Sequence, residues 1–561
     1  MRKSRGDEHG LQPRDRTARN DSMFLAAVTV LAWLPYVAGL GLYSDDWGFV
    51  ASLHAADGSY HGLLESVMGP LGPRPVQGHL LAGLYWLFGL DIVWWHVANG
   101  MALVAIVLLL HHSLRRLGVP RAIALAAPLL FGLLPHYSTD RFWIAVFQAN
   151  ASVLLYATSL YADIRFVHAR PAAVRSRWAW KAAGTAALIA SVLAYEVTAA
   201  LFLVTVVALL HAAGVLRRGS RGRRSLQVAL AVGSNVVALA LTVAYKLSVT
   251  ERADVGGGLR FRALRILTEA VPVHFGELGV GLPTRVLHAL RHYPDPAIVG
   301  VSLVIGLAVA AYLLRLAPSE TPARGTGAGW AGVAAAGLVV FVAGYGVALM
   351  TWEIGFHATG ANNRTAIGAA LGVALVFTAA VGWLASLLPT PRLRVRAFAG
   401  GIALIAACST LITATVARFW VAASDMQQDI IAALARDVPE LPVGAVLLLD
   451  GVCPFHGPAP VFATDWDVTG MLRIMYGDGS LRGDVIKSNT TATSTGIRTI
   501  LFDDWINVYS YGELLRVYHA GSGRSYTLYD RTDAEVYFAA AAATGTASCP
   551  PYTDGDGTDV F

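Results

Sequence analysis

Long apolar stretches separated by short polar segments recur along the first 420 residues of the chain. A helix needs about 20 apolar residues to cross a bilayer, and residues 23–42 form the first stretch of that kind. Further stretches lie at 92–110, 122–134, 142–162, 179–194, 197–216, 226–247, 297–316, 330–351, 366–388 and 398–417. The pattern predicts a mostly α polytopic transmembrane bundle of about eleven spans. Residues 76–90 are also apolar and are either another span or an in-plane helix.

Basic residues gather in four of the predicted connecting loops. These residues are Arg115, Arg116 and Arg121; Arg165, Arg170, Arg175, Arg177 and Lys181; Arg217, Arg218, Arg221, Arg223 and Arg224; and Arg392, Arg394 and Arg396. If 76–90 does not cross, all four loops lie on the side of the N-terminus, and the positive-inside rule makes that side cytoplasmic. We therefore expect a multi-pass cell-membrane protein whose loop 43–78 and C-terminal region are extracytoplasmic.

Composition agrees with this membrane assignment. Hydrophobic residues make up 55% of the chain and charged residues 14%, against about 25% charged in soluble proteins. The formal charge of +6 needs no nucleic-acid partner, because the excess lies in the predicted cytoplasmic loops. Residues 1–22 are polar and predict a disordered cytoplasmic tail, followed by a transmembrane domain over 23–420.

Residues 421–561 have the composition of a soluble domain. An amphipathic helix is expected at 425–438, a buried strand at 443–449, and a hairpin from 514–519 and 525–530. The pattern predicts a small extracytoplasmic α/β domain. Cys453 and Cys549 both lie in it, and an oxidising compartment would permit a disulfide between them.

The outer loop 250–296 is rich in arginine, with apolar residues at helical spacing beside the arginines. We expect outer juxtamembrane helices here. They either anchor the chain in lipid head groups or dock an anionic lipid-linked substrate.

Paired carboxylates, Asp45 and Asp46, follow the first span. Like charges side by side at a membrane boundary raise at least one pKa toward the range of a general base, although either residue could instead cap the next helix. Asp140 and Glu196 also fall at outer ends of spans, whereas the spans themselves carry almost no charge. A transporter usually places charges along its pathway, so this distribution favours a reaction at the outer interface.

Cationic candidates lie on the same side. Arg141 and Arg364 are placed to bind a phosphate, for which arginine is well suited, and Arg74 and His79 are further substrate-binding candidates. Outer histidines (His54, His61, His79, His136 and His357) could join the aspartates in holding a divalent cation, but no ligand spacing demands one. No cofactor is firmly indicated.

The order of these motifs resembles that of the GT-C-type glycosyltransferases, including the protein O-mannosyltransferases. The resemblance rests on Asp45-Asp46-Trp47, Gly72-Pro-Arg-Pro-Val76, Pro135-His-Tyr-Ser-Thr-Asp140-Arg-Phe-Trp143, Tyr195-Glu196 and Asn362-Asn-Arg364, and it covers residues 24–420. It implies an inverting transfer from a polyprenyl-phosphate sugar, with Asp45 or Asp46 as base and Asp140 in the same site. Gly-Pro-Arg-Pro stands where O-mannosyltransferases have His-Pro-Pro, and no tetratricopeptide repeat follows, so the acceptor class does not carry over.

We therefore expect an integral membrane glycosyltransferase acting on a glycan, lipid or protein acceptor at the extracytoplasmic face. Two alternatives remain open at this stage. One is a transporter or flippase of lipid-linked or small solutes, and the other is a non-catalytic scaffold that presents the C-terminal domain.

Overall fold

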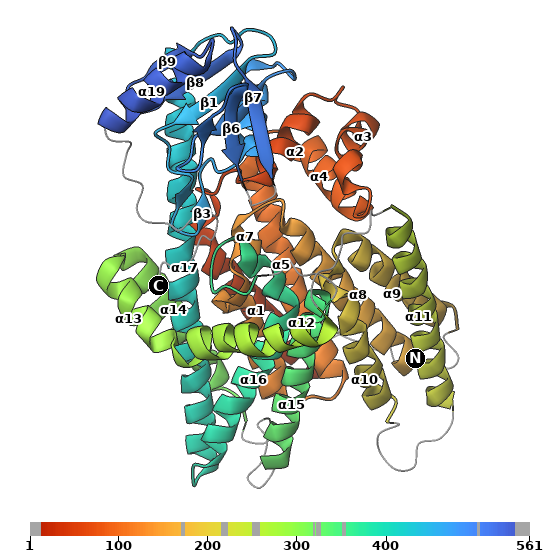
Figure 1. The fold of residues 1–561 in the computed structure, drawn as a ribbon. Helices are drawn as coiled ribbons and strands as arrows, with labels where there is room; N and C mark the ends of the chain where they lie inside the picture. The colour runs from red at the N-terminus through yellow and green to blue at the C-terminus, as the bar shows by residue number, and fades with distance from the viewer. Residues whose placement is uncertain are drawn as a thin grey trace, which may run out of the picture.

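The computed structural model describes residues 13–169, 174–214, 223–249, 258–317, 320, 327–349, 355–501 and 505–544. A bundle of long helices carries a small α/β domain at one end, with short helices beside that domain (Figure 1). The predicted fold class, a transmembrane helical bundle with a small α/β domain, is confirmed.

The long helices form the bundle. They are α1 (Pro13–Val37), α5 (Ile92–Arg116), α6 (Arg121–Leu133), α8 (Phe147–His168), α9 (Val174–Ala194), α10 (Phe202–Ala212), α11 (Arg223–Val249), α14 (Pro296–Leu313), α15 (Gly327–Gly344), α16 (Ile367–Ser386) and α17 (Pro391–Asp437). Within the described residues, six helices are long and apolar enough to cross a membrane: α1, α5, α11, α14, α16 with the turn before it, and α17. Three shorter apolar helices accompany them, so the chain is multi-pass, but the count of about eleven spans is not confirmed.

Short helices gather at the end of the bundle that carries the α/β domain. They are α2 (Asp45–His54), α3 (Tyr60–Leu71), α4 (Pro75–Phe88), η1 (Pro135–Tyr137), α7 (Thr139–Phe142), η2 (Glu196–Leu201), η6 (Gly346–Leu349) and η7 (Ala361–Ala366). The apolar stretch 76–90 corresponds to α4, whose 14 residues are too few to span and which packs on α3. This favours the in-plane alternative.

The arginine-rich outer loop is helical where it is described. It forms α12 (Leu259–Arg265), the π-helical segments η3 (Ile266–Ala270) and η4 (Pro272–Val280), and α13 (Leu282–His292). In Figure 1 the α12 segment runs across the bundle rather than along it, as an interfacial helix would. Residues 250–257 lie outside the described part.

The helix α17 joins the membrane part to the α/β domain. It has 47 residues, begins with a side-chain cap from Thr390, and has Pro391 at its first position. At 1.5 Å per residue it is about 70 Å long, more than twice the thickness of a bilayer core. The predicted domain boundary near residue 420 and the predicted helix 425–438 therefore fall within one continuous helix.

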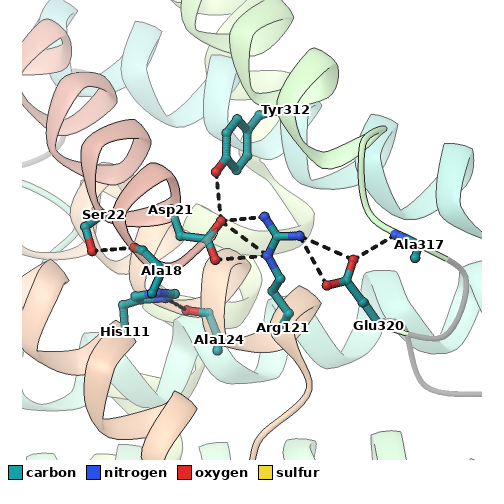
Figure 2. A network of polar contacts seen from close by, with 9 residues as sticks. All are labelled: Ala18, Asp21, Ser22, His111, Arg121, Ala124, Tyr312, Ala317 and Glu320. Carbon is teal, nitrogen blue, oxygen red and sulfur yellow. Dashed lines mark hydrogen bonds and ion pairs between the residues drawn. The ribbon is translucent and has the colours of Figure 1, made fainter. Parts of the chain in front are cut away.

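Residues 13–22, which we expected in a disordered tail, form the first turns of α1. Figure 2 gives the reason: Asp21, only 1% exposed, accepts bonds from Arg121 (Nη2 at 2.6 Å and Nε at 2.9 Å) and from the Tyr312 hydroxyl at 2.7 Å. Arg121 also pairs with Glu320 at 3.2 Å. These contacts tie α1, α6 and α14 together at the end of the bundle away from the α/β domain. Residues 1–12 lie outside the described part.

The α/β domain is built around β1 (Val446–Asp450), which pairs in parallel with β4 (Arg482–Val485) and β8 (Leu515–His519). The fourth strand, β9 (Arg524–Thr527), is antiparallel to β8, so the predicted buried strand and hairpin are both confirmed. The remaining elements are β2 (Phe455–His456), β3 (Ala459–Pro460), α18 (Asp465–Tyr476), β5 (Thr491–Ala492), β6 (Gly496–Ile500), β7 (Ile506–Ser510) and α19 (Arg531–Thr544). The Cys453–Cys549 disulfide stays a prediction, because Cys549 lies outside the described residues.

Candidate active site

The two aspartates of the 43–47 segment have different surroundings. Asp46 is 1% exposed, and its carboxylate accepts hydrogen bonds from the backbone N–H groups of Tyr43 (2.9 Å), Ile144 (3.4 Å) and Ala145. It therefore joins the start of α2 to the segment between α7 and α8. Asp45 is half-buried at the first position of α2, and burial raises the pKa of its carboxyl group, an effect that Arg364 and the Ser44 hydroxyl partly oppose.

Asp140 is an isolated buried carboxylate. It lies in the single turn α7, its side chain is fully buried, and neither carboxylate oxygen has a hydrogen-bond partner among the described residues. Burial raises its pKa well above the usual range, against the opposing charges of Arg364 and Arg141. Buried polar groups without partners are rare in folded proteins, and strongly shifted pKa values cluster at functional sites.

Arg364 links the two carboxylates. It lies half-buried in η7, with its guanidinium carbon 5.3 Å from the centre of the Trp143 ring. Its positive charge lowers the pKa of both Asp45 and Asp140 against the effect of their burial. Three residues from distant parts of the chain thus share one electrostatic environment at the same end of the bundle.

Asn363 holds the Arg364 segment against the Asp140 segment. Its side-chain nitrogen donates to the carbonyls of His136 (3.0 Å) and Ala358 (3.0 Å), and its oxygen accepts from the backbone N–H of Thr139 at 3.3 Å. The side chain is 1% exposed. The Asn363 amide therefore joins the residue before Arg364, which is Asn363 itself, to Thr139, the residue before Asp140.

A second set of charged side chains lies near Arg364 and Asp140. Arg74 and Lys246 both contact the Glu196 carboxylate, at 3.3 Å and 2.6 Å. The Arg74 guanidinium also lies 4.8 Å from the centre of the Tyr195 ring, and Tyr195 is within electrostatic range of Arg364 and Asp140. Burial raises the pKa of Glu196, but Arg74 and Lys246 outweigh it, so the net pKa is lowered and the group stays ionised.

Two other sequence-predicted residues point elsewhere. Arg141 donates from Nη2 to the Leu134 carbonyl at 2.7 Å and lies over the Tyr137 ring, inside a small cavity between α1 and α5. It acts on Asp140 through its charge only. His79 is exposed on α4 and bonds to the Tyr60 hydroxyl at 3.0 Å, with no described contact to the carboxylates.

The outer histidines do not converge. His54 bonds to Tyr85, His79 bonds to Tyr60, and His136 is buried and stacked on His274. Among the described residues, no group of three or more His, Cys, Asp or Glu side chains is arranged to hold a metal ion.

Sequence reasoning missed Lys246, Trp143 and the role of Asn363. Lys246 had a usable signal, since a single lysine near the end of an apolar span is a functional candidate by default. Trp143 and Asn363 occur in the quoted motifs, but their roles depend on side-chain directions that residue spacing does not contain.

No protein-family model matches the chain, and no curated protein matches it. The fold is similar to ArnT from Cupriavidus metallidurans in the apo state (17% identity, 80% of this chain, 86% of that chain, TM-score 0.33) and bound to undecaprenyl phosphate (16%, 82%, 89%, 0.35). It is also similar to an oligosaccharyltransferase from Archaeoglobus fulgidus tethered with an acceptor peptide (14%, 78% of this chain, 62% of that chain, 0.35). The chemistry proposed below therefore rests on the contacts described above.

Proposed function

We propose that the chain is an inverting membrane glycosyltransferase of the GT-C type, which moves a sugar from a polyprenyl-phosphate donor to an acceptor hydroxyl at the extracytoplasmic face. One observation carries the proposal. Asp45 and the unpartnered Asp140 both lie within the field of a single arginine at the membrane boundary. The motif order that resembles the GT-C family supports the same reaction.

Asp45 is the proposed base, because the carboxylate of Asp46 is already occupied by backbone N–H groups. Asp45 takes the proton of the acceptor hydroxyl, and that oxygen forms a bond to the anomeric carbon from the face opposite the phosphate. The bond between the anomeric carbon and the phosphate oxygen breaks, and its electron pair leaves with the phosphate oxygen. Arg364 stabilises the departing phosphate, and a base with a raised pKa works closer to neutral pH.

Asp140 is proposed to orient the sugar, since its carboxyl group has no hydrogen-bond partner among the described residues and can bond to a sugar hydroxyl. Arg74 lies over the Tyr195 ring, and Glu196 balances part of the charge of Arg74 and Lys246. We propose that they bind the side of the donor phosphate away from Arg364. Arg141 is proposed to act on Asp140 through its positive charge. His79 would meet a substrate only at the outer surface.

The test measures release of polyprenyl phosphate and sugar transfer by the purified chain in lipid nanodiscs, with a panel of polyprenyl-phosphate sugars and extracted envelope acceptors. Asp45→Asn should lower the rate by about 10²-fold to 10⁴-fold, the usual contribution of a general base. Asp91→Asn, at an exposed position before α5, is the matched control and should retain the wild-type rate. Wild-type transfer by Asp45→Asn at normal expression would refute the assignment.

A further inference from the structure

The α/β domain is packed directly onto the segment that carries Asp45. Its helix α18 crosses α2 so closely that a Cβ atom added at Gly470 would overlap the backbone of Trp47. The Trp47 ring also lies 5.9 Å from that of Phe462, just before α18. The start of α2 is therefore enclosed between the membrane bundle on one side and the α/β domain on the other.

Ser44, the residue before Asp45, has an unusual backbone conformation. Its φ is 46° and its ψ is −117°, and no other non-glycine residue in the described part has a positive φ. Such a conformation persists only where surrounding contacts enforce it, and it occurs preferentially at functional sites. Contacts of Tyr43, the residue before Ser44, hold the chain in place. Its backbone N–H donates to the Asp46 carboxylate, and its hydroxyl donates to the Trp420 carbonyl of α17 at 2.7 Å.

A hydrogen bond connects the α/β domain to Ser44, the residue before Asp45. The indole Nε1–H of Trp466, at the second position of α18, donates to Ser44 Oγ at 3.4 Å. An indole nitrogen can only donate, so the Ser44 hydroxyl proton is free for another acceptor. The Ser44 hydroxyl lowers the pKa of the adjacent Asp45 carboxyl group, which is the effect that a hydrogen-bond donor has on a carboxylate. Trp466 thus donates to Ser44, and the Ser44 hydroxyl in turn stands next to the accepting carboxylate of Asp45.

We infer that Ser44 and Trp466 are positioning residues for Asp45, so that the α/β domain is a working part of the active centre. This inference rests on the proposed role of Asp45 as the base. Trp466 fixes the Ser44 hydroxyl, and the hydroxyl fixes the rotamer of Asp45 and favours its ionised form. Neither residue is required to touch a substrate.

Other charged groups around Asp45 are unaffected by removal of the indole N–H. Arg364 acts on Asp45 from η7, and Asp46 lies beside it on α2. The elements packed on α2 carry Asp465, Asp467 and Arg473 (α18), His61 and Glu65 (α3), and His79 (α4). Arg473 donates to the Leu481 carbonyl at 3.1 Å. Asp467 accepts from the N–H groups of its own helix start, and His61, Glu65 and His79 are exposed. A titration change in Trp466→Phe would therefore report the relay.

The first arm of the test measures transfer by the full chain in nanodiscs as a function of pH. Ser44→Ala removes a hydrogen bond to a charged group and should move the acidic limb of the kcat profile upward by about one pH unit. Trp466→Phe should move it in the same direction by a smaller amount, with KM for the donor nearly unchanged. Trp383→Phe, which removes an exposed indole on α16, is the matched control and should not move it.

The second arm needs no turnover. Infrared difference spectra of each protein minus its Asp45→Asn counterpart follow protonation of the Asp45 carboxyl group directly. An Asp45 titration that moves upward in both variants supports the relay even if no donor is transferred, in which case the proposed glycosyl transfer fails alone. An Asp45 titration that coincides with that of the wild type in both variants overturns the inference, whatever the rates are.

Discussion

Replacing Asp140 by asparagine should make the protein more stable while it removes function. The side chain is fully buried, and neither oxygen has a hydrogen-bond partner among the described residues. Asparagine has nearly the same shape but carries no charge. The change therefore removes a buried charge without opening a cavity.

An asparagine amide would also lack hydrogen-bond partners here, so the gain is only the part of the burial cost that belongs to the charge, about 1–3 kcal/mol. With an unfolding entropy of about 2 cal/mol/K per residue, a cooperative unit of about 400 residues would gain about 1 to 4 °C in Tm. The pKa of Asp140 is higher in the folded state than in the unfolded chain, because burial outweighs Arg364 and Arg141. The folded protein thus holds the proton more tightly, and its stability falls as pH rises above the unfolded pKa of about 3.9.

Thermal unfolding in nanodiscs, followed by intrinsic fluorescence at pH 4.5 and 7.5, measures this difference. The gain in Tm of Asp140→Asn over wild type should be small at pH 4.5 and larger at pH 7.5, together with loss of transfer. Asp91→Asn should change Tm by less than about 1 °C at both values. A lower Tm for Asp140→Asn at pH 7.5 would mean that Asp140 has a stabilising partner, and it would refute the reasoning.

Two further predictions concern stability alone and are read from the same unfolding curves. Asp46→Asn should destabilise the fold by about 1–3 kcal/mol, because an amide NH₂ would then face a backbone N–H; an increase in stability would show that those bonds are not formed. Arg121→Leu should cost about 3–5 kcal/mol, because it leaves the buried Asp21 with Tyr312 as its remaining described donor. Adding Asp21→Leu should recover much of that loss, and strictly additive losses in the double variant would contradict the ion-pair explanation.

Apolar length and turn chemistry were sufficient to predict much of the fold. Strand β1 consists of the apolar run 446–449 and Asp450, with Gly444 before it and Gly451 after it, and the hairpin β8–β9 brackets a glycine-rich turn. Span counting was less successful, because helix length depends on tertiary contacts. Pro75 starts α4 and Gly89 ends it after 14 residues, although the apolar run alone would also have suited a span.

Charge patterning did not predict burial. Lys181 was counted in a basic loop, yet it lies buried in α9 and donates to Asp163 and Asn235, both at 2.7 Å. The Asn235 amide also donates to Asp163, at 2.6 Å. The signal was ambiguous because a lysine beside an apolar run either faces the lipid head groups or reaches back to a partner on another helix. Only the packing of α8, α9 and α11 decides between these arrangements.

The candidate site depends on parts of the chain that no local pattern connects. Asp45, Asp140 and Arg364 each follow an apolar stretch at the same end of the bundle, so their shared side was predictable from topology. Trp466 was not, because it belongs to a domain that α17 carries back over the first outer segment. The strained Ser44 and the unpartnered Asp140 both cost stability, and the surrounding bundle and domain maintain them. A scaffold that only displayed the α/β domain would gain stability by losing both features, which is a physical reason to favour catalysis over that alternative.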